Sequence, residues 1–368
     1  MTFGSSVAPR FSVAVPVFNH ERFVGETVAS AFGQDYEGLE VLISDNASTD
    51  RSREVAVAAS GGRAIVASNA TNIGFAANLD RAVALGTAPF VMLVSSDDRM
   101  QPNALSTYAH LLDEVDDPGR VILTAASWRI DEHGEVTGRI GRDERMWAGA
   151  SLDAGLSQTV GHDVWSIGAG DLLAASLRYF RNPASFVSTC YPRSVWEAVG
   201  GYRGARLANP DKWFLWRALT QVDRVLFVDE PLFDYRRHSS NVAKSRWMAQ
   251  SLTQAVDDYC SLLELTDEML AFAGVDRDAV EQAFLNEAVL KRAAVFAADG
   301  RSSEAVTYRR FAAAVAGGRG VRNRWWWFAG ALTIPGVHRL VPRRFVDGRV
   351  GDSLLHGDRP VTAQQRAT

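Results

Sequence analysis

The stretch Phe90-Val91-Met92-Leu93-Val94-Ser95-Ser96-Asp97-Asp98 joins a short apolar run to a polar cluster that ends in two carboxylates. A short apolar run bounded by polar residues is typical of a strand buried on both faces of a parallel sheet. Ligands of such sheets bind beyond the carboxyl ends of the strands. We therefore expect Asp97 and Asp98 to lie in a solvent-facing loop beside a bound ligand. The alternative is that they are solvated loop charges or a helix cap.

Upstream of this stretch, strand-like and helix-like segments alternate. Helices of this length between strands predict a parallel sheet with right-handed crossovers. Asn19, Asp45 and Asp97 each follow a predicted strand, so their side chains should converge on one crevice. No G-x-G-x-x-G sequence follows the first strand, which argues against a dinucleotide dehydrogenase. The expected strands are Phe11–Val17, Leu39–Ser44, Ala64–Ser68 and Phe90–Val94, the expected helices are Glu21–Phe32, Arg51–Ala59 and Gly74–Leu85, and Pro102 is expected in the first turn of the next helix.

The rest of the chain divides into two further regions. Residues 131–245 are rich in glycine and aromatic residues, and the pattern of strands is looser there. Residues 246–315 have helical periodicity, with Leu252, Val256 and Tyr259 on one apolar stripe. The fold class we expect is α/β: a Rossmann-like, mostly parallel sheet flanked by helices, with a helical C-terminal extension over residues 246–368.

The composition narrows the class of protein. A formal net charge of −4 over 368 residues provides no global attraction for nucleic acid. Cys190 and Cys260 fit neither a metal spacing nor a disulfide framework, which indicates a reducing compartment. Met1–Arg10 lacks the pattern of a secretory leader, and no apolar run approaches the ~18–20 residues that span a bilayer. We therefore expect a cytoplasmic protein without nucleic-acid partners.

Several blocks of the N-terminal region resemble the opening of the family 2 glycosyltransferases. They are Val15-Pro16-Val17-Phe18-Asn19, Ala29-Ser30-Ala31-Phe32-Gly33-Gln34-Asp35-Tyr36 and Ile43-Ser44-Asp45-Asn46-Ala47-Ser48-Thr49-Asp50. The segment from Asn72 to Asn78 is similar to the next family block. Val94-Ser95-Ser96-Asp97-Asp98 falls where the family carries its metal-binding D-x-D. The resemblance implies a GT-A fold, a nucleoside-diphosphate-sugar donor, Mn²⁺ or Mg²⁺ as cofactor, and inverting transfer.

The resemblance also implies roles for single residues. Asp45 would hydrogen-bond the nucleobase, and Asp97 would bind the metal or its diphosphate with Asp98 beside it. Ser95 replaces the first acid of the D-x-D, and Ala77 replaces the arginine common before the block's final asparagine. These departures make metal and ribose contacts less secure than nucleotide binding. The residues expected to bind the nucleotide-sugar are Pro16, Val17, Asn19, Asp45, Asn78, Ser96, Asp97 and Arg236.

A downstream block places the expected catalytic base. Gly200-Gly201-Tyr202, followed by Asp211-Lys212-Trp213-Phe214-Leu215-Trp216-Arg217, resembles a family region whose aspartate is the general base. The resemblance makes Asp211 the catalytic residue, although Pro210 precedes it where the family has an acid. The alternative is that Asp211 caps the helix that follows, and both roles are compatible. The regions are then a nucleotide-sugar-binding half (1–130) and an acceptor-binding and catalytic half (131–245) of one domain.

The segment Tyr235-Arg236-Arg237-His238-Ser239-Ser240-Asn241 looks like the family's Y-R-x-H-x-x-N. His238 would complete the metal site through a ring nitrogen. Arg236 would meet the donor diphosphate with its planar guanidinium. A packing role for both residues is the alternative.

Two aromatic-rich regions have open interpretations. Trp165, Tyr179 and Phe186 could stack on sugar rings of the acceptor, but core packing is the more common fate of aromatic residues. Trp325–Phe328 lies between arginines, which suits peripheral contact with an anionic membrane on its cytoplasmic face. The alternative for this tail is a packed helix with a basic face.

The function we expect is transfer of a sugar from a nucleoside-diphosphate-sugar to a hydroxyl of a glycan or lipid-linked acceptor, as in polysaccharide biosynthesis. A non-catalytic module that binds nucleotide-sugar or glycan is the first rival, since Ser95 and Pro210 replace expected acids. A sugar nucleotidyltransferase is the second. It would carry a glycine-rich N-terminal loop with a basic residue, and this sequence has none.

Overall fold

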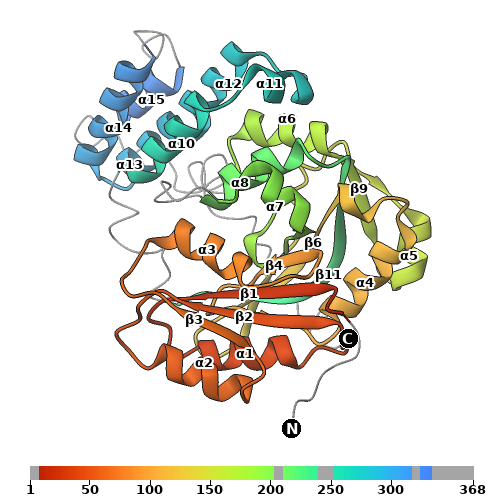
Figure 1. Cartoon of the computed structure of the whole chain (residues 1–368). Helices are drawn as coiled ribbons and strands as arrows, with labels where there is room; N and C mark the ends of the chain where they lie inside the picture. The colour runs from red at the N-terminus through yellow and green to blue at the C-terminus, as the bar shows by residue number, and fades with distance from the viewer. Residues whose placement is uncertain (1–7, 203–209, 239–251, 317–323, 334–368) are drawn as a thin grey trace. The chain divides into compact units, whose positions relative to one another are not determined.

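A computed structural model describes residues 8–202, 210–238, 252–316 and 324–333 (Figure 1). These residues form two compact units. The first contains residues 8–172, 182–202 and 210–238, and the second contains residues 173–181, 252–316 and 324–333. The predicted border between the two halves of the domain, at residue 130, falls at the end of strand β6 (Val121–Ile130). Residues on both sides of this border contribute strands to one sheet.

One sheet organises the first unit, in the order β3-β2-β1-β4-β10-β6-β11-β9-β8, with β5 on β11 and β7 on β6. The neighbours among β1 to β4 pair in parallel. β10 is antiparallel to both β4 and β6, and β11 is parallel to β6. β6 and β11 therefore run in the direction of β4, so the carboxyl ends of β1, β2, β4 and β11 share one edge. The strands are β1 (Phe11–Val17), β2 (Leu39–Asp45), β3 (Ile65–Ser68), β4 (Phe90–Leu93), β5 (Arg99–Met100), β6 (Val121–Ile130), β7 (Val136–Ile140), β8 (Ser151–Leu152), β9 (Val164–Gly168), β10 (Cys190–Pro192) and β11 (Arg224–Arg236).

Strand β1 shows why the sheet is buried on both faces, since every residue from Phe11 to Val17 is buried. Val15 and Val17 pack with Val28 and neighbouring aliphatic residues beneath one face. Pro16 lacks the N–H that a central strand needs. The pairing of β1 with β4 ends at Ala14, so Pro16 lies beyond it and interrupts no bond of that pair.

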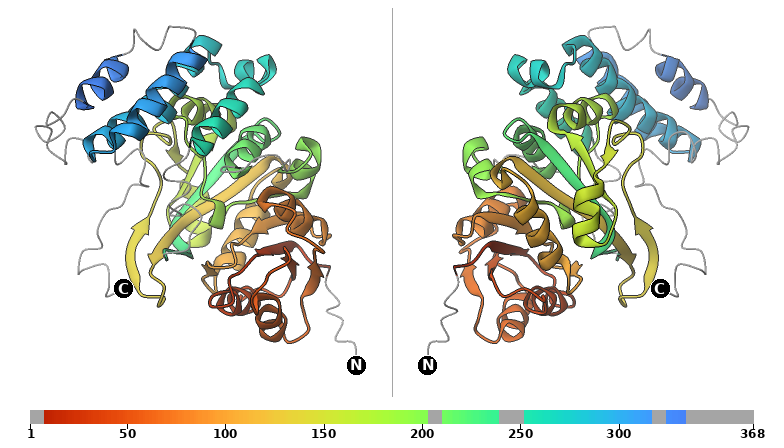
Figure 2. Two further views of the ribbon diagram at one scale, coloured as in Figure 1. Left: turned by 90° about the vertical axis from the view of Figure 1, so that its left-hand side faces the viewer. Right: turned by 90° about the vertical axis from the view of Figure 1, so that its right-hand side faces the viewer.

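Helices cover both faces of the parallel strands. α1 and α2 lie on one face and α3 on the other (Figure 1, Figure 2). Pro102 precedes α4 and is not in its first turn, because the turn before the helix is used for tertiary bonds: Gln101 N donates to Leu232 O at 2.9 Å. The helices of this unit are α1 (Val24–Phe32), α2 (Ser52–Ser60), α3 (Phe75–Ala84), α4 (Ala104–Glu114), α5 (Ala154–Val160), α7 (Arg193–Val199) and α8 (Pro210–Leu219), with 3-10 turns at Pro118–Arg120 and Phe186–Ser188. The expected Rossmann-like sheet flanked by helices is confirmed, with antiparallel strands added in its second half.

The second unit is helical, as its periodicity predicts. Its aromatic core joins Phe284 to Phe180, Tyr259 and Phe311, with ring centroids 5.2 to 6.4 Å apart. No helix among the described residues is both long and apolar enough to cross a membrane. Its helices are α6 (Ala169–Tyr179, which begins in the first unit), α10 (Thr253–Leu263), α11 (Asp267–Ala273), α12 (Arg277–Ala283), the π-helix η4 (Phe284–Leu290), α13 (Lys291–Ala298), α14 (Ser302–Val315) and α15 (Arg324–Leu332). Most of the basic tail, including Arg319, Arg322, Arg339, Arg343 and Arg344, lies outside the described residues.

Candidate active site

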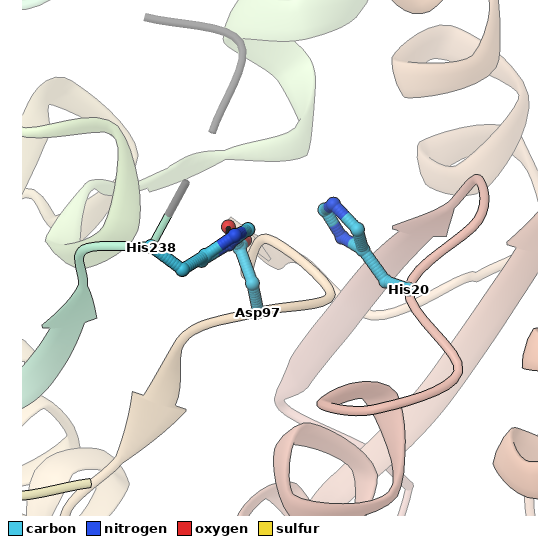
Figure 3. Close-up of side chains that lie close together, drawn as sticks. All are labelled: His20, Asp97 and His238. Atoms are coloured by element: carbon cyan, nitrogen blue, oxygen red, sulfur yellow. Dashed lines mark hydrogen bonds and ion pairs between the residues drawn. The ribbon is translucent and has the colours of Figure 1, made fainter. Parts of the chain in front are cut away.

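The candidate site lies at the shared carboxyl edge of the sheet. The loops after β1 and β4 and the end of β11 bring His20, Asp97 and His238 together (Figure 3). One potential ligand atom of each residue lies within 4.8 Å of those of the other two. Nε2 of His238 is 2.9 Å from Oδ2 of Asp97, and Nδ1 of His20 is 2.8 Å from Oγ of Ser96. The donor set is thus two imidazoles and one carboxylate.

The Asp97–Asp98 loop is held from two directions. Thr27 of α1 donates its Oγ1 hydrogen to the Asp98 carbonyl oxygen at 2.7 Å. Arg236 at the end of β11 donates its backbone N–H to Oδ1 of Asp98 at 2.8 Å. Asp97 is only 6% exposed, so the expectation of a solvent-facing loop is wrong. The reason is that β11 and α1 cover the loop, which sequence periodicity does not report.

Arg236 is a positioning residue in this structure. Its side chain is 1% exposed and stacks over Phe23, with Cζ 5.0 Å from the ring centroid. Nε donates to the Asp97 carbonyl oxygen at 2.8 Å, and Nη2 donates to Oε2 of Glu26 at 2.6 Å. Nη1 lies 3.4 Å from the Asp131 carbonyl oxygen. The guanidinium therefore binds the protein itself in this structure, and its expected contact with the donor diphosphate stays a prediction.

We predict that Arg236→Lys destabilises the protein by about 1–3 kcal/mol, because lysine lacks the fork that satisfies a buried carbonyl and a carboxylate together. Thermal unfolding measures this effect. Arg22→Lys is the matched control, since the Arg22–Glu132 pair is exposed, with side chains 60% and 42% accessible, and should change stability by less than ~0.5 kcal/mol. An unchanged melting temperature with a raised KM for the donor would instead support the predicted contact of Arg236 with the donor diphosphate.

Burial perturbs two ionisable groups here. Burial, and then the charge of Asp97, raises the pKa of the Asp98 carboxyl well above its usual range. Burial also lowers the pKa of His20, although the charge of Asp97 opposes that shift. Such perturbed groups gather at functional sites. Asp98 lies outside the group of three potential ligands and its Oδ1 faces Arg236, so its expected role in metal binding stays a prediction.

The loops after β1 and β2 are tied to each other. Asn19 has φ 53°, a left-handed conformation that asparagine tolerates. Its Oδ1 accepts from Thr49 N at 2.8 Å, and its N–H donates to Ser48 Oγ at 3.1 Å. Asp45 is 4% exposed, and its Oδ1 accepts from Ser48 N at 3.3 Å. Asn19 and Asp45 thus lie at the site edge, as the sequence predicts, while their contacts with a nucleotide stay predictions.

Asn78 lies beneath this edge and supports it. Its side chain is 2% exposed, its Nδ2 donates to the Ser44 carbonyl oxygen at 3.1 Å, and its Oδ1 accepts from Ser44 Oγ at 2.8 Å. Pro16 and Val17 are buried in β1, where the Val17 carbonyl oxygen accepts from Asn46 N at 2.8 Å. These three residues shape the loops that face the site. Any direct contact with the donor stays a prediction.

Asp211 lies apart from the His–Asp–His group, in the first turn of α8. Burial raises the pKa of its carboxyl, which is the direction expected of a general base tuned toward neutral pH. Asn182 donates its Nδ2–H to Oδ2 of Asp211. The helix begins at Pro210, so Asp211 is inside the helix and is not its N-cap. Asp211 lines a small cavity with Leu93, Phe186, Thr189, Tyr191, Tyr202, Phe214 and Leu215.

The cavity that Asp211 lines lies beside the carboxyl end of β4. Leu93 ends β4, the strand that leads into the Asp97 loop. Phe186, one of the three aromatic residues considered for the acceptor, lines the cavity, whereas Tyr179 belongs to the second unit. His20 and Asn182 were missed by sequence reasoning. His20 follows Asn19 directly at the ligand edge of β1 and could have been found by that position, but Asn182 has no local signal.

Known proteins resemble this chain in sequence. Residues 12–162 match the model of the family described as Glycosyl transferase family 2. Glycosyltransferase GlyG of Streptococcus pneumoniae is 21% identical over 285 residues, covering 75% of this chain and 85% of that protein. An uncharacterized glycosyltransferase of Rickettsia felis is 27% identical over 126 residues, or 34% of this chain. The chain covers only 21% of that second relative.

A solved structure shares the fold. TarS of S. aureus, in complex with UDP-GlcNAc, superimposes with a TM-score of 0.59 at 16% identity, covering 92% of each chain. The fold is therefore the GT-A fold, as in TarS. Residues 12–162 are thus similar to the family 2 glycosyltransferases.

Proposed function

We propose that the protein transfers a glycosyl group from a nucleoside-diphosphate-sugar to a hydroxyl of a glycan or lipid-linked acceptor, with inversion at the anomeric carbon. The observation that carries this proposal is the arrangement of two acidic centres. Asp97, held against His238, ends the loop after β4, while Asp211 lines a cavity with Leu93 of the same strand. Asp97 on the loop after β4 would then bind the donor, and Asp211 on α8 would accept the proton. The TarS complex with UDP-GlcNAc supports a nucleotide-sugar as the donor class.

The residues at the sheet edge fit a divalent cation. Asp97 offers a carboxylate oxygen and His238 an imidazole nitrogen, both nearly buried and 2.9 Å apart. Carboxylate and imidazole are ordinary ligands of Mn²⁺ and related ions. A cation bound there would stabilise negative charge on the diphosphate leaving group. Mn²⁺ or Mg²⁺ remains the cofactor we propose for this step.

In the proposed reaction, Asp211 accepts the proton of the acceptor hydroxyl as the hydroxyl oxygen bonds to the anomeric carbon. The bond from that carbon to the diphosphate breaks in the same step, which inverts the configuration. Burial of Asp211 favours its protonated form, so the carboxylate gains basicity for this transfer. Asn182 holds one carboxylate oxygen and so orients the other.

We also propose an acceptor class and peripheral contact with a membrane. The acceptor is a glycan or lipid-linked hydroxyl, presented at the cytoplasmic face of the membrane. The tail that would contact the membrane lies mostly outside the described residues, and within the described part Trp327 is 62% exposed. Peripheral contact through this tail therefore rests on its arginine-flanked aromatic sequence.

We predict that one class of nucleotide-sugar stabilises the protein in a panel of UDP-, GDP- and dTDP-sugars, and that EDTA removes most of the effect. A ligand at 100 times its Kd adds about 2.7 kcal/mol of stability. Thermal unfolding measures binding, and release of nucleoside diphosphate without acceptor measures turnover. Binding without any release, with or without candidate acceptors, would favour the non-catalytic module. No stabilisation by any donor would contradict the proposal.

A further inference from the structure

We propose that His20 is a third protein ligand of the cation, and that the resulting site of two imidazoles and one carboxylate selects a first-row transition metal over Mg²⁺. The inference rests on the proposed function only in taking the Asp97–His238 pair as a cation site. It adds a ligand that the D-x-D resemblance does not supply. It also replaces the open choice between Mn²⁺ and Mg²⁺ with a definite preference.

The geometry places His20 among the ligands. Its ring lies toward Asp97 and His238 in Figure 3, and the potential ligand atoms of the three residues lie within 4.8 Å of one another. The ring centroids of His20 and His238 are 5.8 Å apart. A divalent ion with ligand distances of about 2.0–2.2 Å bridges atoms at such separations with small side-chain shifts. The three residues come from three separate loops, so the group is not a by-product of one turn.

His20 is held in place before any ion binds. Its backbone N–H donates to Ser52 Oγ at 2.7 Å, and Nδ1 lies 2.8 Å from Ser96 Oγ. A second hydrogen bond on a ligating histidine fixes the ring and its tautomer, as metal-site histidines usually require. The Asp97–His238 pair is also ordered, with side chains 9% and 1% exposed. This order lowers the conformational cost of binding an ion without nucleotide.

The donor set decides which ion is preferred. Ser95 occupies the position of the first acid of the D-x-D, so this position adds no second carboxylate. Asp97 is the one carboxylate of the His20–Asp97–His238 group. Mg²⁺ prefers oxygen ligands and near-ideal octahedral geometry, and it loses water reluctantly. Imidazole favours the later first-row metals, whose affinities rise from Mn²⁺ through Co²⁺. Two nitrogen ligands therefore lower the affinity of the site for Mg²⁺ relative to Mn²⁺ and Co²⁺.

The test measures metal binding to the untagged full-length chain without nucleotide. Isothermal titration with Mn²⁺, Co²⁺ and Mg²⁺ gives affinities, and visible absorption of bound Co²⁺ reports its coordination directly. We expect Co²⁺ and Mn²⁺ to bind at least about tenfold more tightly than Mg²⁺. His20→Ala should weaken Co²⁺ binding by at least about tenfold and change the Co²⁺ spectrum. His110→Ala, on the exposed face of α4, is the matched control and should change neither.

A second variant tests the preference itself. His20→Asp replaces nitrogen with oxygen and should narrow the gap between Co²⁺ and Mg²⁺ even if overall stability falls. His20→Ala could bind Co²⁺ with the affinity and spectrum of the parent while His238→Ala loses Co²⁺ binding. In that case His20 is not a ligand, and this inference fails while the proposed function stands. If the parent binds none of the three ions with or without donor nucleotide, the cation in the proposed function fails as well.

Discussion

Asp97→Asn is expected to lower turnover by at least about 100-fold, because the amide removes the only carboxylate of the His20–Asp97–His238 group. The substitution keeps the size of the side chain, and the amide oxygen still accepts a hydrogen bond from His238 Nε2. The fold should therefore survive, although Asp97 is nearly buried. Initial rates over a range of Mn²⁺ concentrations measure the loss. A partial recovery at high Mn²⁺ would show weakened ion binding.

Two further variants make this result specific. Asp116→Asn, on an exposed surface residue, should leave turnover unchanged. Asp98→Asn tests whether the neighbouring carboxylate also binds the ion, and we expect a smaller effect on metal affinity because Asp98 faces Arg236. Turnover like that of the parent in Asp97→Asn would remove Asp97 from the cation site.

Asp211→Asn is expected to lower turnover by about 10²- to 10⁴-fold while leaving donor affinity nearly unchanged. A general base acts on the acceptor in the transition state, so its loss appears in kcat and not in donor binding. Isothermal titration with the donor nucleotide beside initial rates separates the two effects. A parallel fall in affinity and rate would make Asp211 a donor-positioning or helix-stabilising residue.

The raised pKa of Asp211 adds two expectations of opposite sign. Activity of the parent protein should fall as pH drops through this raised pKa, because the base must be ionised. The contribution of Asp211 to the free energy of unfolding changes with pH in the opposite direction. The folded state binds the Asp211 proton more strongly than the unfolded state, so this residue's contribution falls as pH rises from the ordinary to the raised pKa. Asp211→Asn should thus keep or raise the melting temperature at neutral pH. A clear loss of stability there would contradict the desolvation of the carboxylate.

Local sequence determined the first half of the fold and the acidic loop. Strand and helix periodicities are local properties, and Phe11–Val17 and Phe90–Leu93 lie where those patterns predict strands. A polar residue directly after a buried strand lies at the ligand edge of a parallel sheet, whatever the distant chain does. Asp45 and Asp97 therefore lie at this edge, as the sequence predicts, although Asp97 is buried and does not face solvent.

Only the tertiary structure decided how that edge is completed. β10 runs antiparallel between β4 and β6, and the end of β11 pairs with β5, which directly follows the Asp97–Asp98 loop. The contact between His238 and Asp97 spans 141 residues of sequence, and no local pattern encodes such pairing. The same long-range packing buries Arg236 against Glu26 and brings His20 beside Asp97. A side chain's role here depends on which distant atoms satisfy it, because a buried polar group takes its partners from the assembled fold.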